Sequence, residues 1–99
     1  MKTQLETDNM TKAIITVVGK DTVGIIAHIC TYLASSNINI LNITQNIVNN
    51  YFNMMMIVDL TQTEKTFETI STELEDEGKS KGVQAKIQLE EIFNKMYRI

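Results

Sequence analysis

The sequence predicts an α+β protein of the ferredoxin-like βαββαβ type: a four-stranded antiparallel sheet with two helices on one face and a short C-terminal helix. Three observations support this prediction. Apolar residues alternate or run together in four short segments, as they do in strands. They recur at helical spacing in two longer segments between these strands. The length of 99 residues suits one domain with one core.

The first strand and the first helix are expected before residue 37. The sequence KAIITVV, residues 12–18, is apolar and β-branched on both alternating faces, which is typical of a central strand, and Gly19 ends it. In residues 23–36 the apolar side chains fall on one helix face, whereas His28 falls on the opposite, polar face and is expected to be solvated. The apolar face consists of Ile26, Ile29, Cys30 and Leu33.

The next two strand-like runs, INILNITQNIV and YFNMMMIVDL, predict a β-hairpin. Asn49 and Asn50 separate them, and asparagine tolerates the positive φ angles of a tight hairpin turn. The apolar pattern of the first run changes phase between Ile40 and Leu41, which predicts a β-bulge. In the second run, alternation turns the central methionine of MMM away from its two neighbours.

The second half of the chain predicts a helix, a strand and a final helix. Thr61 and Glu64 have the spacing of a capping box ahead of a helical apolar pattern that ends near Gly78, and the acidic run 73–77 is expected to be a solvated helix end. Apolar and polar residues alternate strictly in residues 83–90, as in a strand with one face in water. The C-terminal helix is predicted from the spacing of Ile92, Phe93, Met96 and Tyr97.

Composition narrows the possible function classes. The polar residues 1–9 lack the apolar run of a secretory signal and are expected to form a disordered N-terminal extension, with residues 10–99 as a single domain. No apolar run is long enough to cross a membrane. Cys30 is the single cysteine, which suits the reducing cytoplasm. The net charge of −3 disfavours direct nucleic-acid binding, which requires a basic surface.

The turn VVGKDTVGI excludes several kinds of site. A P-loop ends in Gly-Lys-Ser/Thr, whereas here Asp21 follows Lys20, and its carboxylate would repel a phosphate. One histidine and one cysteine on opposite helix faces disfavour a metal site, and no cofactor is expected. Because no nucleophile and base can be paired, we do not expect an enzyme. Gly24 at a helix start, where free N–H groups and the helix dipole favour a carboxylate, suits a small amino acid as ligand.

The stretches VVGKDTVGI, SSNINILNITQ and YFNMMMIVDL together resemble the ACT domain, a small regulatory module that binds amino acids. The likeness spans Met10–Ile99 and is greatest to short, stand-alone bacterial ACT proteins of unassigned function. In the family, the turn carries an acidic residue, a proline and a glycine before an apolar residue. Asp21, Gly24 and Ile25 match this pattern, but Val23 stands where proline is common, which leaves the turn less rigid.

The resemblance implies a ligand site between this turn and the start of the second strand, often that of a neighbouring domain. The residues implied on the turn side are Asp21, Thr22, Gly24 and Ile25. Asn39 is implied on the strand side, with Asn37 as the alternative. We therefore expect a non-catalytic regulatory or sensing domain for a small amino acid. The alternative is a ligand-free module that pairs with and regulates another protein.

The hairpin's first strand, residues 38–48, predicts a homodimer. This topology places it on a sheet edge, yet it is rich in Ile, Leu and Val and has neither lysine nor proline to discourage pairing. We expect a two-fold dimer, packed edge to edge or face to face, to which the C-terminal helix contributes. Such a dimer would bring Asn39 close to the turn at residues 21–24 of its partner, so that ligand binding and assembly are coupled.

Overall fold

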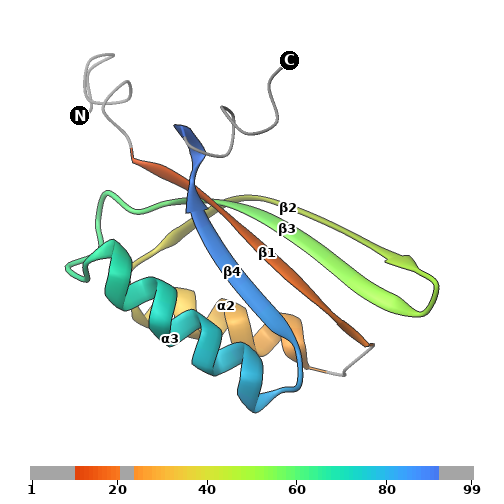
Figure 1. Cartoon of the computed structure of the whole chain (residues 1–99). Coiled ribbons are helices and arrows are strands. Elements are labelled where there is room, and N and C mark those ends of the chain that lie inside the picture. The colour runs from red at the N-terminus through yellow and green to blue at the C-terminus, as the bar shows by residue number, and fades with distance from the viewer. Residues whose placement is uncertain (1–10, 21–23, 92–99) are drawn as a thin grey trace.

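The computed structural model describes residues 11–20 and 24–91, and these residues form the predicted βαββαβ order. The expected extension at residues 1–9 and the expected C-terminal helix beyond residue 91 lie outside the described residues. The elements in Figure 1 are β1 (Lys12–Lys20), α2 (Ile25–Ser35), β2 (Asn39–Val48), β3 (Tyr51–Asp59), α3 (Phe67–Ser80) and β4 (Gln84–Leu89).

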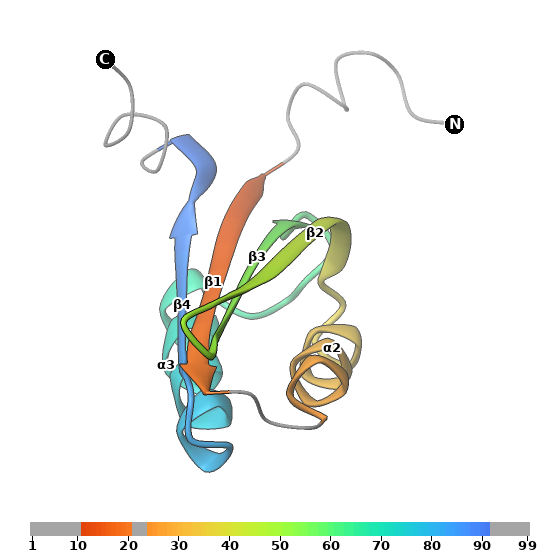
Figure 2. The ribbon, with the colours of Figure 1, turned by 90° about the vertical axis from the view of Figure 1, so that its right-hand side faces the viewer.

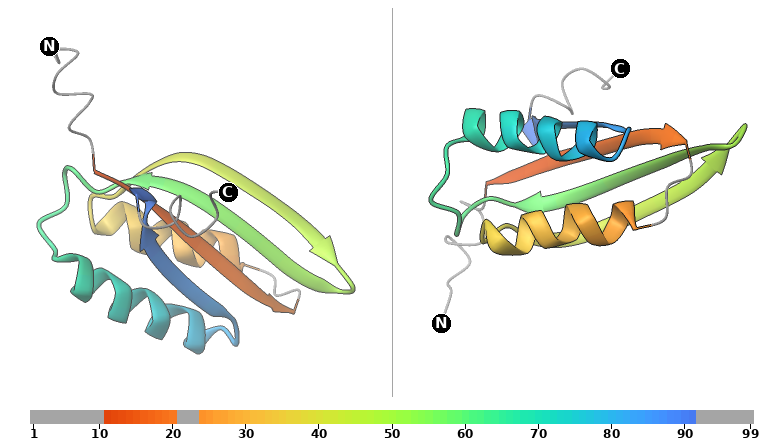
Figure 3. Two further views of the ribbon diagram at one scale, coloured as in Figure 1. Left: turned by 45° about the horizontal axis from the view of Figure 1, so that its top comes forward. Right: turned by 90° about the horizontal axis from the view of Figure 1, so that it is seen from below.

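The strands form a four-stranded antiparallel sheet in the order β2-β3-β1-β4, so β1 is central and β2 and β4 are the edges. Figure 2 shows α2 and α3 on the same side of this sheet. The two views of Figure 3 show that α2 lies along the β2–β3 side and α3 along the β1–β4 side. The predicted fold and the predicted edge position of β2 are confirmed.

The core fills the space between the helices and one face of the sheet. Every second residue of a strand points into it, because side chains alternate between the faces of a sheet. The strands contribute Ala13, Ile15, Val17, Phe52, Met54, Met56, Val58, Ala85 and Ile87, all at most 8% exposed. The helices contribute Ile25, Ile29, Tyr32, Leu33, Ile70 and Leu74.

The hairpin between β2 and β3 has the predicted geometry. Asn49 and Asn50 have φ angles of 52° and 69°, which is the left-handed region that a two-residue hairpin turn requires. The register between β2 and β3 shifts between Ile40 and Asn42, which confirms the predicted bulge at Leu41. The bulge lets apolar residues on either side of it face the same layer.

The predicted capping box of the second helix is wrong. The N-cap of α3 is Thr66, whose Oγ1 accepts a hydrogen bond from Thr69 N at 3.1 Å. Thr61 instead donates from its Oγ1 to Asp59 Oδ1 at 2.6 Å and closes the turn that follows β3. Threonine is common both in turns and at helix N-caps, because its hydroxyl can bond nearby backbone groups in either place. The sequence alone therefore does not tell which threonine caps the helix.

The buried face of α2 is also rotated from the predicted one. Tyr32 is 9% exposed and belongs to the core, whereas Ile26 and Cys30 are only partly buried. The spacing of Ile25, Ile29 and Tyr32 is that of one helical stripe. α2 packs against α3 as well as the sheet, so its buried surface is wider than a single row of residues.

Candidate functional site

The N-terminal end of α2 begins at Gly24, whose φ of 87° lies in the left-handed region that favours glycine. The Gly24 carbonyl accepts the first helical hydrogen bond, from His28 N at 2.9 Å. Among the described residues no side chain caps this helix end, and its first turn contains no acidic residue. The dipole and the first N–H groups of α2 are therefore directed at whatever lies in front of Gly24.

The residues of the turn have different roles at this helix end. Ile25 is 3% exposed and packs into the core, so only its backbone faces outward from the helix start. A Cβ added at Gly24 would have no atom within 4 Å. Glycine is thus required here for its φ angle and not for lack of room for a side chain. Asp21 and Thr22 lie outside the described residues.

Asn39 lies at the other end of the molecule from Gly24. It begins β2 opposite Asp59 and is exposed, and Asp59 in turn pairs with Lys12 at the start of β1. Gly24 follows the far end of β1, and α2, about 16 Å long for 11 residues, separates the two. One chain therefore does not bring Gly24 and Asn39 together.

Asn37 has a structural role that explains its residue type. Its φ of 59° ends α2 in the left-handed conformation. Asn37 N donates to Ala34 O at 3.1 Å, and Ile38 N donates to Leu33 O at 2.9 Å, the hydrogen-bond pair of a Schellman motif. Because this role accounts for Asn37, Asn39 is the stronger candidate for a ligand contact.

The β2 edge is open along its length. Ile40 is half-buried and packs against the core, whereas residues 41–48 are all exposed, with Ile47 at 65% and Leu41 at 41%. In the described part of the chain no strand pairs with the outer side of β2, and β2 contains neither proline nor lysine to discourage such pairing. An antiparallel partner on this edge would set the beginning of one β2 beside the end of the other.

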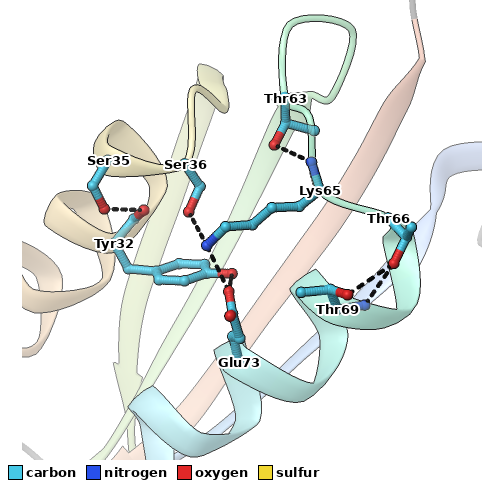
Figure 4. Close-up of polar contacts among 8 residues, drawn as sticks. All are labelled: Tyr32, Ser35, Ser36, Thr63, Lys65, Thr66, Thr69 and Glu73. Carbon is cyan, nitrogen blue, oxygen red and sulfur yellow. Dashed lines mark hydrogen bonds and ion pairs between the residues drawn. The ribbon is translucent and has the colours of Figure 1, made fainter.

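Sequence reasoning missed a polar cluster between the two helices, shown in Figure 4. The Tyr32 hydroxyl donates to Glu73 Oε1 at 2.9 Å, and Lys65 Nζ donates to the same oxygen at 2.6 Å. Lys65 Nζ also donates to Ser36 Oγ at 3.0 Å and lies 4.9 Å from the centre of the Tyr32 ring. The cluster joins the exit of α2, the loop before α3 and α3 itself.

The pKa values within this cluster follow from its geometry. Burial raises the pKa of the Tyr32 phenol to about 12, and the hydrogen bond to Glu73 acts in the same direction. Hydrogen bonds from Lys65 and then from Tyr32 lower the pKa of the Glu73 carboxyl. With Lys65 and Glu73 bound to each other, the cluster is satisfied internally and is a clamp between elements rather than a reactive site.

The lone histidine and the lone cysteine are both structural in this fold. His28 is not on a solvated face as expected: its Nε2 lies 2.5 Å from Glu77 Oε1, where α2 meets α3. With Glu73 in the clamp and Glu77 beside His28, the acidic run is not simply solvated either. Burial raises the pKa of the half-buried Cys30 thiol, which makes it a poor nucleophile.

Neither a metal cluster nor a membrane span is found in residues 11–20 and 24–91. In these ranges no three His, Cys, Asp or Glu side chains lie close enough to hold a metal ion. Of the helices described, neither has the length and apolar character needed to cross a bilayer.

This chain is similar to known proteins in both its sequence and its structure. A family model described as ACT domain matches residues 11–88. The chain is 58% identical over 90 residues to a UPF0237 protein of Bifidobacterium longum, covering 91% of this chain and 100% of that protein. A UPF0237 protein of Methanocaldococcus jannaschii is 43% identical over 90 residues, covering 91% and 100%, so the relatives are archaeal as well as bacterial. The structure of an ACT domain protein from Streptococcus pneumoniae has a TM-score of 0.78 and 39% identity, covering 90% of this chain and 100% of that one.

Proposed function

The chain belongs to the ACT-domain family, and from that premise we propose that it is a non-catalytic regulatory domain that binds a small amino acid. The observation that carries the proposal is the N-terminal end of α2. It begins on a left-handed Gly24, no described side chain caps it, and no neighbouring atom would contact a Cβ at Gly24. A free α-carboxylate is the group that such a helix end attracts.

The ligand site is completed by a second copy of the chain. Val48 at the end of β2 pairs with Tyr51, and Tyr51 pairs with Lys20, so the end of β2 and the Gly24 turn lie at the same end of the sheet. Antiparallel pairing of two β2 edges sets the start of one β2 at this end of the other chain. The exposed Asn39 amide then lies near Gly24 of the partner subunit and is available to bind the ligand's carboxylate or amino group.

A ligand-free interaction module is the second candidate. The specific observation in its favour is the unprotected β2 edge, which suits strand pairing with another protein as well as with a second copy. A calorimetric and thermal-shift screen of the twenty amino acids at millimolar concentration separates the two functions. A regulatory site requires roughly −4 to −8 kcal/mol of binding free energy. No heat and no shift with any amino acid would favour the interaction module.

Once a ligand is found, mixing two variants tests the shared site. Gly24→Val blocks the helix end and Asn39→Ala removes the amide, so each variant alone is expected to lose at least about tenfold in affinity. A mixed dimer of the two has one site in which both residues are native, so mixing is expected to restore tight binding. Asn42→Ala, an exposed amide on the same strand, is the control that retains affinity. If mixing restores nothing, the site is not shared between subunits.

A further inference from the structure

The polar contacts between the side chains of α2 and α3 lie at two levels along the helices. The helices run side by side in opposite directions (Figure 3), so successive turns of one meet successive turns of the other. At one level the Tyr32 hydroxyl donates to Glu73 Oε1 at 2.9 Å. At the other level His28 Nε2 lies 2.5 Å from Glu77 Oε1. Each level thus joins an α2 side chain to a glutamate of α3, and the two levels are one helical turn apart.

The level at Tyr32 keeps the same charges throughout the neutral pH range. Lys65 Nζ donates to Glu73 Oε1 at 2.6 Å and to Ser36 Oγ at 3.0 Å (Figure 4), and lysine side chains in general titrate only in alkaline solution. The pKa of the Tyr32 phenol is raised to about 12, and the pKa of the Glu73 carboxyl is lowered. Between about pH 5 and 8 this clamp is therefore insensitive to protons.

The level at His28 lacks a second cation of the kind that Lys65 supplies. α2 itself contains no Asp, Glu, Lys or Arg. The charged residues of the surrounding elements are Glu73, Glu75, Asp76, Glu77 and Lys79 in the second half of α3, Lys81 after it, Lys20 at the end of β1 and Asp59 at the end of β3. Of these, Glu77 contacts His28, and Glu73 belongs to the clamp. The ion pair at this level therefore exists only while the His28 ring is protonated.

The attraction between His28 and Glu77 depends on the charge of the ring. His28 Nε2 is shielded from water, and within the described residues no well-aligned hydrogen bond reaches it. A protonated imidazole attracts a carboxylate at this distance through its charge, whereas a neutral imidazole has no charge with which to do so. Histidine is the side chain that ordinarily changes its charge between about pH 5 and 8. The contact is thus strong on the acidic side of this range and weak on the alkaline side.

His28 is also bonded to the candidate ligand site. Its backbone N–H donates to the Gly24 carbonyl at 2.9 Å, which is the first hydrogen bond of α2. No described side chain caps this helix end, and an uncapped end leaves its first N–H groups without fixed partners. The buried Ile25 holds the first turn through apolar packing. The contact with Glu77 adds a polar attachment of the same turn to α3.

We propose that protonation of His28 fastens the first turn of α2 to α3, so that the order of the Gly24 end depends on pH. At about pH 5.5 the ion pair and the packing of Ile25 hold the turn together, whereas at about pH 8 the ion pair is lost and the packing remains. The other end of α2 stays clamped at both pH values. His28 is thus a positioning residue. Its effect on amino-acid binding rests on the proposed function: a ligand carboxylate that requires ordered N–H groups at Gly24 binds more tightly to the protonated chain.

A double-mutant cycle in urea unfolding of the full chain tests the ion pair at about pH 5.5 and about pH 8. The cycle compares His28→Gln, Glu77→Gln and the double variant with wild type. At the lower pH, which is above the range in which glutamate side chains ordinarily titrate, the two changes should be coupled about two- to fivefold in the folding equilibrium constant. At the higher pH the coupling should disappear. Glu75→Gln removes the same charge from an exposed position beside β4 and should show no coupling to His28→Gln at either pH.

Amide hydrogen exchange, expressed as protection factors so that the intrinsic pH dependence cancels, locates the effect on α2. The His28 N–H should be about two- to fivefold better protected at the lower pH in wild type and in Glu75→Gln, and equally protected at both pH values in Glu77→Gln. The Ile38 N–H, which donates to Leu33 O at the clamped end, should not respond to pH.

The proposal is overturned if the coupling is absent at the lower pH or equal at both pH values. It is also overturned if the His28 and Ile38 N–H groups respond to pH alike. Because no ligand is added, these measurements decide on the proton-dependent contact whatever the screen of amino acids shows about the proposed function.

Discussion

The two faces of the sheet use the same residue type for different purposes, as three consecutive methionines show. Met54 and Met56 are 2% and 0% exposed under the helices. Met55 between them is 40% exposed on the sheet face that α2 and α3 leave uncovered, which is called the open face below. The covered face buries its side chains within one chain and stabilises the fold. The open face keeps apolar area in water, which a stable monomer does not require. The alternation of side chains along β3 thus decides which methionines stabilise the fold.

Truncating two adjacent methionines, one at a time, should give the largest difference in stability between the two faces. Met56→Ala removes a fully buried side chain and is expected to lower the free energy of unfolding by about 2–5 kcal/mol. Met55→Ala is expected to change the free energy of unfolding by no more than about 0.5 kcal/mol, because Met55 is exposed and its truncation leaves no enclosed cavity. Urea unfolding at a protein concentration where the chain is monomeric measures both. Equal losses would show that the open face is also part of the intramolecular core.

Adding one methyl group to each face of the sheet should give a smaller difference in stability between the two substitutions. Gly19 lies on the covered side, and a Cβ there would come within 2.4 Å of Val83 Cγ1 and 3.2 Å of Val83 Cα. Gly19→Ala is therefore expected to destabilise by about 1–3 kcal/mol through overpacking. Val18→Ile adds one methyl to the open face, where Val18 is 41% exposed, and is expected to stay within about 0.5 kcal/mol.

The same unfolding assay measures both of these substitutions. If Gly19→Ala is neutral, Val83 and the start of β4 move aside easily. The covered face would then be less tightly packed at this end than the distances indicate.

The sequence predicted most of the fold because local signals agreed with the tertiary arrangement. The pair Asn49-Asn50 required a hairpin turn, and the phase change at Leu41 required a bulge, so both were predictable from local backbone chemistry. The start of α3 was predicted wrongly because Thr61 and Thr66 both suit a cap, and the choice depends on Asp59 taking Thr61 for its turn.

The candidate site was harder to predict for a different reason. The sequence identified Gly24 from its place at a helix start, but Asn39 only through the family resemblance. That the two residues lie at opposite ends of α2 follows from the topology. The clamp of Tyr32, Lys65 and Glu73 was missed because its members are 8 to 41 residues apart. No spacing rule joins such residues before the helices are packed.

The smallest expected effect on stability is that of the clamp of Tyr32, Lys65 and Glu73, and it is confined to alkaline pH. The pKa of Tyr32 is raised to about 12 in the folded chain, against about 10 in an unfolded one, so the folded state holds the phenol proton more tightly. The stabilisation is complete below pH 10 and is lost as the pH rises through 12. Of the three tyrosines, one is expected to ionise near pH 12 in an absorbance titration at about 295 nm, and Tyr32→Phe should remove this step.

The pH dependence of the free energy of unfolding then distinguishes the contribution of the clamp from that of the other contacts between the helices. Between pH 10 and 12 the wild-type free energy of unfolding should fall more steeply than that of Tyr32→Phe, because lysine titration is common to both chains. Lys65→Met keeps the phenol but removes the donor that holds Glu73, so its alkaline step should remain. If wild type and Tyr32→Phe lose stability in parallel, the Tyr32 hydroxyl does not hold α2 against α3, and burial of apolar side chains alone keeps the helices on the covered face.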